Sequence, residues 1–209
     1  MTIDYRKLIF FSLRFVAYVL VLAGLNWIYR FDATHFTGDI KVTENSMTEI
    51  TQEIILFFVF IGFYIVGRRS KDLAPVTNLM ALVFFMSLIR ELNNFIPFWF
   101  YIVLPFIIWF AYLLVKNFKK VLAAFEKFIG LRSSGAFFIG FLITYMFSRL
   151  FGKTSFWITL LGDSYTRTAK NMAEEGVELL GYTIILISVI ELLVYVYEKK
   201  PGQEKEADN

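Results

Sequence analysis

Six long apolar runs dominate this chain and leave few folds open to it. The runs extend over roughly Leu8–Tyr29, Glu49–Val66, Leu73–Phe95, Phe98–Val115, Ser133–Phe151 and Glu174–Tyr197. About 20 apolar residues suffice for a helix to cross the hydrocarbon core of a bilayer. We therefore predict an all-α fold, a polytopic membrane helix bundle with about six transmembrane helices. Residues 1–198 are expected to form one bundle domain, and residues 199–209 a charged cytoplasmic tail.

The composition supports membrane residence and excludes several kinds of chemistry. The chain is 57% hydrophobic and 19% charged, whereas soluble domains are nearer 45–50% apolar and about 25% charged. It contains no cysteine and a single histidine, His35, which excludes disulfides, thiolate metal sites and bis-histidine haem ligation. The net charge of +3 arises from basic residues near the ends of the runs. We therefore expect the lipid bilayer as the surroundings and no nucleic-acid partner.

Basic residues are distributed unevenly between the two sides that six spans define. The even-numbered connections and both ends of the chain carry most of them, namely Arg6, Lys7, Arg68, Arg69, Lys71, Lys116, Lys119, Lys120, Lys127, Arg132, Lys199, Lys200 and Lys205. The odd-numbered connections carry fewer, namely Arg30, Lys41, Lys153, Arg167 and Lys170. Because lysine and arginine accumulate on the cytoplasmic side, we predict cytoplasmic N- and C-termini. We expect the membrane to be a bacterial inner membrane.

The connection 117–131 after the fourth run has an amphipathic pattern. Its apolar residues alternate at helical spacing with Lys119, Lys120 and Lys127. Such a pattern is typical of a helix that lies on the anionic cytoplasmic leaflet. The alternative is a continuation of the fourth span.

Ionisable residues interrupt the runs mainly at their predicted outward ends. Residues spaced i, i+3, i+4 and i+7 share one face of a helix. Two polar stripes have this spacing: Ser87, Arg90, Glu91 and Asn94 on the third run, and Tyr145, Ser148, Arg149 and Gly152 on the fifth. The second and sixth runs begin with acidic faces made of Glu49, Gln52 and Glu53 and of Glu175, Glu178 and Tyr182. We therefore predict one outward-facing polar cluster made of Glu49, Glu53, Arg90, Glu91, Asn94, Arg149, Glu175 and Glu178.

Charge at this depth is costly and indicates a functional site by default. A carboxylate there must pair, reach water or take up a proton, so we expect at least one Arg–Glu contact. Carboxylates outnumber the arginines, which leaves negative charge for a proton or for a hard divalent cation such as Ca²⁺, Mg²⁺ or Mn²⁺. Glu53, Glu91 and Glu178 are the candidate metal ligands. The alternative is structural: Glu49 and Glu174 lie in first helical turns, and the arginines reach up to head groups.

Two further features lie outside this cluster. Arg14 and Glu191 lie at matching depths near the cytoplasmic side, which predicts a structural salt bridge if their helices are neighbours. His35 lies in the first outward connection among Asp32, Thr34 and Asp39. A lone histidine in a loop is more often solvated than catalytic, and it becomes a ligand only if that loop folds over the carboxylates.

Three classes of function remain open on the sequence alone. The first is a small cation- or proton-linked transporter, channel or accessory subunit, acting as a homo-oligomer or with a membrane-protein partner. The second is a membrane-embedded enzyme that acts on a lipid-linked substrate at the outer leaflet, with Arg90 and Arg149 binding phosphate. The third is a structural or immunity-type protein that binds another membrane protein. No nucleophile or nucleotide-binding motif is present, so no catalytic residue is predicted.

Overall fold

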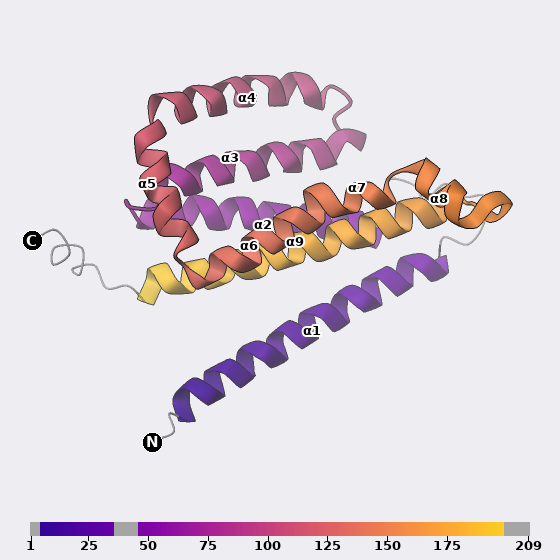
Figure 1. Ribbon diagram of the computed structural model, residues 1–209, viewed down its shortest axis with the longest axis horizontal. Coiled ribbons are helices and arrows are strands. Elements are labelled where there is room, and N and C mark those ends of the chain that lie inside the picture. The colour runs from indigo at the N-terminus through magenta and orange to yellow at the C-terminus, as the bar shows by residue number, and fades with distance from the viewer. Residues whose placement is uncertain (1–4, 36–45, 199–209) are drawn as a thin grey trace, which may run out of the picture.

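The computed structural model describes residues 5–35 and 46–198, and every regular element in these two ranges is a helix (Figure 1). The elements are α1 (Tyr5–His35), α2 (Met47–Arg69), α3 (Ala74–Glu91), η1 (Leu92–Asn94), α4 (Trp99–Lys116), α5 (Phe118–Ile129), α6 (Arg132–Leu142), η2 (Ile143–Phe147), α7 (Ser148–Phe151), α8 (Thr154–Leu161), η3 (Gly162–Ser164) and α9 (Arg167–Glu198). The expected tail 199–209 lies outside the described residues.

Within residues 5–35 and 46–198, six helical stretches are long and apolar enough to cross a membrane: α1, α2, α3, α4, the continuous stretch Arg132–Phe151 and α9. The predicted helical membrane bundle is thus confirmed, and the chain is an integral membrane protein. Some predicted boundaries were wrong. α1 continues past Tyr29 to His35, and α9 begins at Arg167 rather than at Glu174. A hydropathy run marks the part of a helix that lies in lipid, and these helices extend beyond it into polar sequence.

The core is built largely from aromatic side chains of different helices. Phe63 of α2 stacks on Phe84 of α3, with ring centroids 5.6 Å apart, and meets the edge of Phe137 of α6 at 5.7 Å. Phe128 of α5 joins the group 5.5 Å from Phe137. Edge-to-face and offset pairs of this kind add about 0.5–1.5 kcal/mol each beyond the area they bury. They fix α2, α3, α5 and α6 around one interior.

The amphipathic connection forms a helix of its own, α5, which is separated from α4 at Asn117. It runs across the ends of the neighbouring spans rather than along them (Figure 1). Its inner face buries Ala124 and Phe128, and Lys127 Nζ lies 3.1 Å from Asp72 Oδ2. The alternative of a continuous fourth span is therefore wrong, while the location of α5 at the cytoplasmic leaflet stays a prediction.

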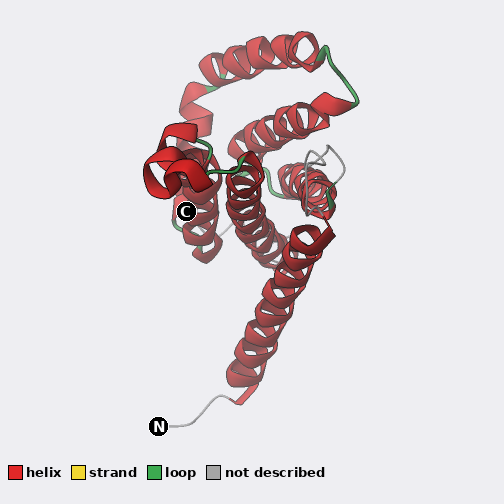
Figure 2. Cartoon of the chain, turned by 90° about the vertical axis from the view of Figure 1, so that its right-hand side faces the viewer, coloured by secondary structure: helices red, strands yellow, loops and turns green. Residues whose placement is uncertain are grey.

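The spans differ strongly in how deeply they are packed. α9 packs against α2 on one side and against α6, η2 and α7 on the other, and it buries large side chains such as Tyr182 and Leu192. α1 lies outside this group of helices (Figures 1 and 2), and the most apolar 18-residue stretch of α1 buries none of its residues. α9 is therefore the helix on which the polar residues of the other spans converge.

Candidate functional site

The predicted cluster residues lie at one end of the bundle, where α2 begins, α3 and α7 end, and α9 passes its first turns (Figure 1). We call this the polar end. α1 begins and α9 ends at the opposite end (Figure 1). The side chain of Asn94 is outside the described part of the structure, so its proposed membership is not assessed.

The first group at the polar end is built around Glu178 of α9. Its side chain is 9% exposed and is paired with Arg149 of α7. Ser148 Oγ lies 3.2 Å from Glu178 Oε1. Arg149 also reaches Glu174, whose Oε1 lies 3.4 Å from Nη1, and Lys170 Nζ lies 3.9 Å from the other Glu174 oxygen. At least one Arg–Glu contact was expected here, and this pairing ties α7 to α9.

The second group is built around Glu91 at the end of α3. Arg90 pairs with Glu91 on the same helix, and the hydroxyl of Tyr182 on α9 donates to Glu91 Oε1 at 3.2 Å. The rings of Tyr182 and Tyr145 meet edge to face at 6.2 Å, and the Tyr145 hydroxyl lies 2.9 Å from Ser87 Oγ of α3. A closed set of polar contacts therefore joins α3, η2 and α9.

The third group joins α2 to α9. Ser46 caps α2 by accepting a hydrogen bond of 3.0 Å from the Glu49 backbone N–H. The buried Gln52 donates its amide N–H to the carbonyl oxygen of Glu175 at 2.8 Å. Glu53 lies within electrostatic range of Glu49 and Glu91. Glu49 does lie in a first helical turn.

Glu174 and Glu175 do not lie in a first helical turn. α9 begins at Arg167, two turns earlier in the sequence. The dipole explanation for Glu174 is therefore wrong, because that stabilisation fades beyond the first turn.

Asp32 is a buried residue of this end that the cluster prediction omitted. Its sequence neighbourhood predicts a loop, but Asp32 lies in the last turns of α1 and is 3% exposed. Its carboxylate accepts hydrogen bonds from the backbone N–H groups of Met47 and Thr48, at 3.0 and 2.8 Å, and from Thr48 Oγ1 at 2.5 Å. Asp32 thereby satisfies donors at the start of α2 that would otherwise lack partners and attaches α1 to the bundle.

His35 also belongs to α1 rather than to a loop. Its ring stacks on Phe31 with centroids 3.9 Å apart, and Nδ1 lies 2.9 Å from the Phe31 carbonyl oxygen. These contacts are local to α1 and do not bring the imidazole to the carboxylates. Asp39, expected beside it, lies outside the described residues.

The fifth span contains a π-helical turn, η2, directly before the polar end. The uniform stripe predicted there assumes an uninterrupted α-helix. In the structure Tyr145 of η2 contacts both α3 and α9, while Ser148 and Arg149 contact α9. A π-turn places an extra residue in the turn and so rotates the side chains beyond it about the helix axis. Such turns are frequent at functional sites.

Close helix packing supports this geometry. A Cβ atom at Gly140 would lie 2.7 Å from the carbonyl oxygen of Gly181, and one at Gly181 would collide with Thr144. The small residues let the fifth span and α9 approach backbone to backbone. The buried hydroxyl groups beside the polar end are thereby held at fixed positions.

The carboxylates at the polar end are not equally neutralised. Among the described residues, arginine and lysine side chains pair with Glu91, Glu174 and Glu178. No arginine or lysine in residues 5–35 and 46–198 forms an ion pair with Glu53 or Glu175. Glu175 lies within electrostatic range of four other carboxylates, those of Asp32, Glu49, Glu91 and Glu174.

The candidate metal ligands Glu53, Glu91 and Glu178 do not converge. Within the described ranges no three His, Asp or Glu side chains are placed to hold a metal ion. Glu91 and Glu178 are instead engaged by different arginines. The geometry therefore does not offer a tridentate site made of these three carboxylates.

At the opposite end of the bundle, Arg14 Nη1 lies 3.0 Å from Glu191 Oε2, the contact that matching depths predict. Tyr18, one turn further along α1, donates its hydroxyl to Glu191 Oε1 at 2.5 Å. The spacing of Arg14 and Tyr18, four residues apart, could have indicated this second contact. The structural role of the pair stays a prediction.

Comparisons of the chain with protein-family models, with curated proteins and with solved structures found no match.

Proposed function

We propose that this integral membrane protein binds a proton or a cation at its polar end, as a small cation- or proton-linked transporter, channel or accessory subunit. The observation that carries the proposal is the environment of Glu175. Its carboxylate lies among four others, and no cationic side chain of the described residues pairs with it.

The electrostatic energies favour binding of a proton or cation by Glu175 over an ionised carboxylate without a counter-charge. Two like charges about 6 Å apart repel by roughly 3 kcal/mol at an effective dielectric constant of about 20. A helix N-terminus supplies about 0.3–1 kcal/mol, and only within its first turn, which Glu175 is not in. Binding of a proton or a cation by a carboxylate in this position removes the repulsion between the like charges.

A structural role is the second candidate, and a specific observation supports it. Both Arg90 and Arg149 are engaged by carboxylates, as expected of a network that locks helices together for binding another membrane protein. The same pairing weakens the case for an enzyme that acts on a lipid-linked substrate. Binding of phosphate by Arg90 or Arg149 would have to compete with the carboxylate that already pairs with that arginine. We propose a bacterial inner membrane as the location, and a homo-oligomer or a partner protein as the working form.

The experiment is a thermal-unfolding series on the purified protein in lipid nanodiscs. Melting temperatures are measured against pH and against Na⁺, K⁺, Mg²⁺, Ca²⁺ and Mn²⁺ for the wild type and for Glu175→Gln and Glu53→Gln. Glu126→Gln is the matched control, because Glu126 is exposed on α5 at the other end of the bundle. Glu91→Gln and Glu178→Gln test the arginine pairs.

We expect acid or one of the cations to raise the melting temperature of the wild type. We expect this rise to be lost in Glu175→Gln and kept in Glu126→Gln. Glu91→Gln and Glu178→Gln each remove the carboxylate that pairs with an arginine. We expect them to lower the melting temperature while its response to acid or cations is kept. A melting temperature independent of pH and of every cation, together with strong destabilisation by each Gln variant at the polar end, would favour the structural role instead.

A further inference from the structure

Two sets of polar contacts attach α1 to the bundle. Near the C-terminal end of α1, Asp32 accepts hydrogen bonds from the start of α2. In its N-terminal half, Arg14 and Tyr18 bind Glu191 of α9. Between these two attachments α1 stays largely exposed, so part of the space between α1 and α9 is not filled by side chains.

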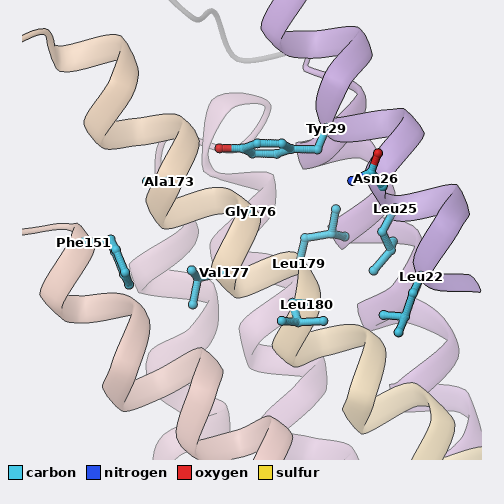
Figure 3. A pocket seen from close by; sticks show the side chains of 10 residues that line it. All are labelled: Leu22, Leu25, Asn26, Tyr29, Phe151, Ala173, Gly176, Val177, Leu179 and Leu180. Atoms are coloured by element: carbon cyan, nitrogen blue, oxygen red, sulfur yellow. The ribbon is translucent and has the colours of Figure 1, made fainter.

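That space is a groove of about 420 Å³ between the half of α1 and the half of α9 that lie nearest the polar end (Figure 3). Its walls are mainly apolar, and the lining residues are Leu22, Leu25, Asn26, Tyr29, Phe151, Ala173, Gly176, Val177, Leu179 and Leu180. The groove is open to the side, where a membrane would present lipid. None of the carboxylates described above is among its lining residues.

One contact closes the end of the groove that is nearest the polar end. Tyr29 extends from α1 across to α9 beside Gly176 (Figure 3). A Cβ atom at Gly176 would lie 2.7 Å from Tyr29 Cε2, so the ring rests on the bare backbone of that turn. The glycine therefore allows the tyrosine to cover the groove, with its hydroxyl at the edge.

The size and the lining of the groove suit a hydrocarbon chain. From Ala173 to Leu180 the α9 wall is about 10 Å long, at 1.5 Å per residue. A volume of about 420 Å³ along mainly apolar side chains gives room for part of an acyl chain.

The polar atoms at the groove indicate which lipid it takes. Asn26 is exposed on α1, and its amide has no hydrogen-bond partner among the described residues, an unfavourable state in lipid. Tyr29 lies at the closed end of the groove, and tyrosine is enriched at the level of the lipid head groups. Tyr29 also lies within electrostatic range of Glu175. The nearby excess of carboxylates attracts a positively charged head group.

We propose that this groove binds one phospholipid with an amine head group, taken from the leaflet at the polar end. One of its two acyl chains lies along Leu22, Val177 and Leu180. Its glycerol and ester groups meet the Asn26 amide and the Tyr29 hydroxyl. Its ammonium group faces the carboxylates of the polar end.

The test is native mass spectrometry of the full chain released from nanodiscs that contain phosphatidylethanolamine, phosphatidylglycerol and phosphatidylcholine in equal amounts. The groove is filled in the double variant Leu22→Trp with Val177→Phe. The matched control is Leu20→Trp with Ile190→Phe, which makes comparable changes at exposed positions of the same helices outside the groove. Asn26→Leu tests the polar contact separately.

We expect the wild type and the control to retain one lipid, with phosphatidylethanolamine favoured at least threefold over phosphatidylglycerol. We expect at least a fivefold loss of retained lipid in the filled variant and a smaller loss in Asn26→Leu. Equal retention by the filled and control variants would overturn the groove as the binding site. Equal retention of the ethanolamine and glycerol lipids would overturn the amine assignment. A melting temperature of the filled variant near that of the control shows that the fold is intact.

Discussion

Replacing Arg149 by methionine is expected to destabilise the protein substantially, because Glu178 then loses its charged partner. Glu178 is 9% exposed and pairs with Arg149, leaving Ser148 Oγ at 3.2 Å as its remaining contact. A buried acceptor deprived of its partner bears the full cost of desolvation. Methionine keeps the length and the apolar stem of arginine, so the change removes charge more than packing.

The magnitude follows from how far each partner is buried. Breaking a fully buried pair by removing one partner costs about 3–5 kcal/mol, whereas an exposed pair contributes about 0–1 kcal/mol. The Arg149 side chain is 48% exposed, so its pair lies between these limits. We expect Arg149→Met to lower the free energy of unfolding by about 2 kcal/mol.

The assay is equilibrium unfolding in mixed micelles, followed by tryptophan fluorescence. Arg167→Met is the control, since Arg167 is exposed at the same end and should change stability by no more than about 0.5 kcal/mol. The double variant Arg149→Met with Glu178→Met removes both charges and is expected to recover to within about 1 kcal/mol of the wild type. An Arg149→Met protein as stable as the control would refute the reasoning, as would a double variant less stable than Arg149→Met alone.

Two further perturbations test the contacts that hold the polar end in place. Gly181→Ala is expected to cost about 1–3 kcal/mol, because its added methyl group collides with Thr144 and the neighbouring backbone. Gly135→Ala, with open space around its Cβ position, should be neutral or slightly stabilising, and equal effects in the two unfolding curves would contradict the close-packing account. Asp32→Ala removes the carboxylate that accepts hydrogen bonds from Met47 and Thr48 at the start of α2, and it is expected to cost about 0.5–2 kcal/mol, while Asp163→Ala at an exposed turn should not. Limited proteolysis between α1 and α2 should be faster in Asp32→Ala than in the wild type and unchanged in Asp163→Ala. Unchanged cleavage of Asp32→Ala would count against the attachment of α1 through Asp32.

The number of spans and the grouping of charges could be predicted from the sequence because both depend on one-dimensional patterns. Apolar runs of span length define the six helices, and helical spacing places Ser87 and Glu91 on one face. The contact of Arg14 with Glu191 was predicted from matching depth on the condition that their helices are neighbours. Apart from that condition, each of these inferences needs only a residue's position along its own helix.

Other features depended on how helices sit against one another, which the patterns do not contain. Asp32 acts on the start of α2 only because α1 continues as a helix beyond its apolar run. The π-turn of η2 has no marker in the sequence, yet it lies where Tyr145 contacts both α3 and α9 and Ser148 contacts α9. The groove beneath Tyr29 exists because α1 stays largely exposed between its polar contacts at Tyr18 and Asp32. Helix α8, which is short and lies in the connection after the fifth span, was also missed.

The central claim is that no arginine or lysine of the described residues forms an ion pair with Glu175, and that its carboxylate binds a proton or a cation. The most direct measurement is infrared difference spectroscopy of the reconstituted protein at neutral pH, with and without added cations. In cation-free buffer we predict the C=O stretching band of a protonated carboxyl group, lost in Glu175→Gln and kept in Glu126→Gln. A cation that binds there should reduce the band. Absence of that band from the wild type in cation-free buffer would contradict the claim.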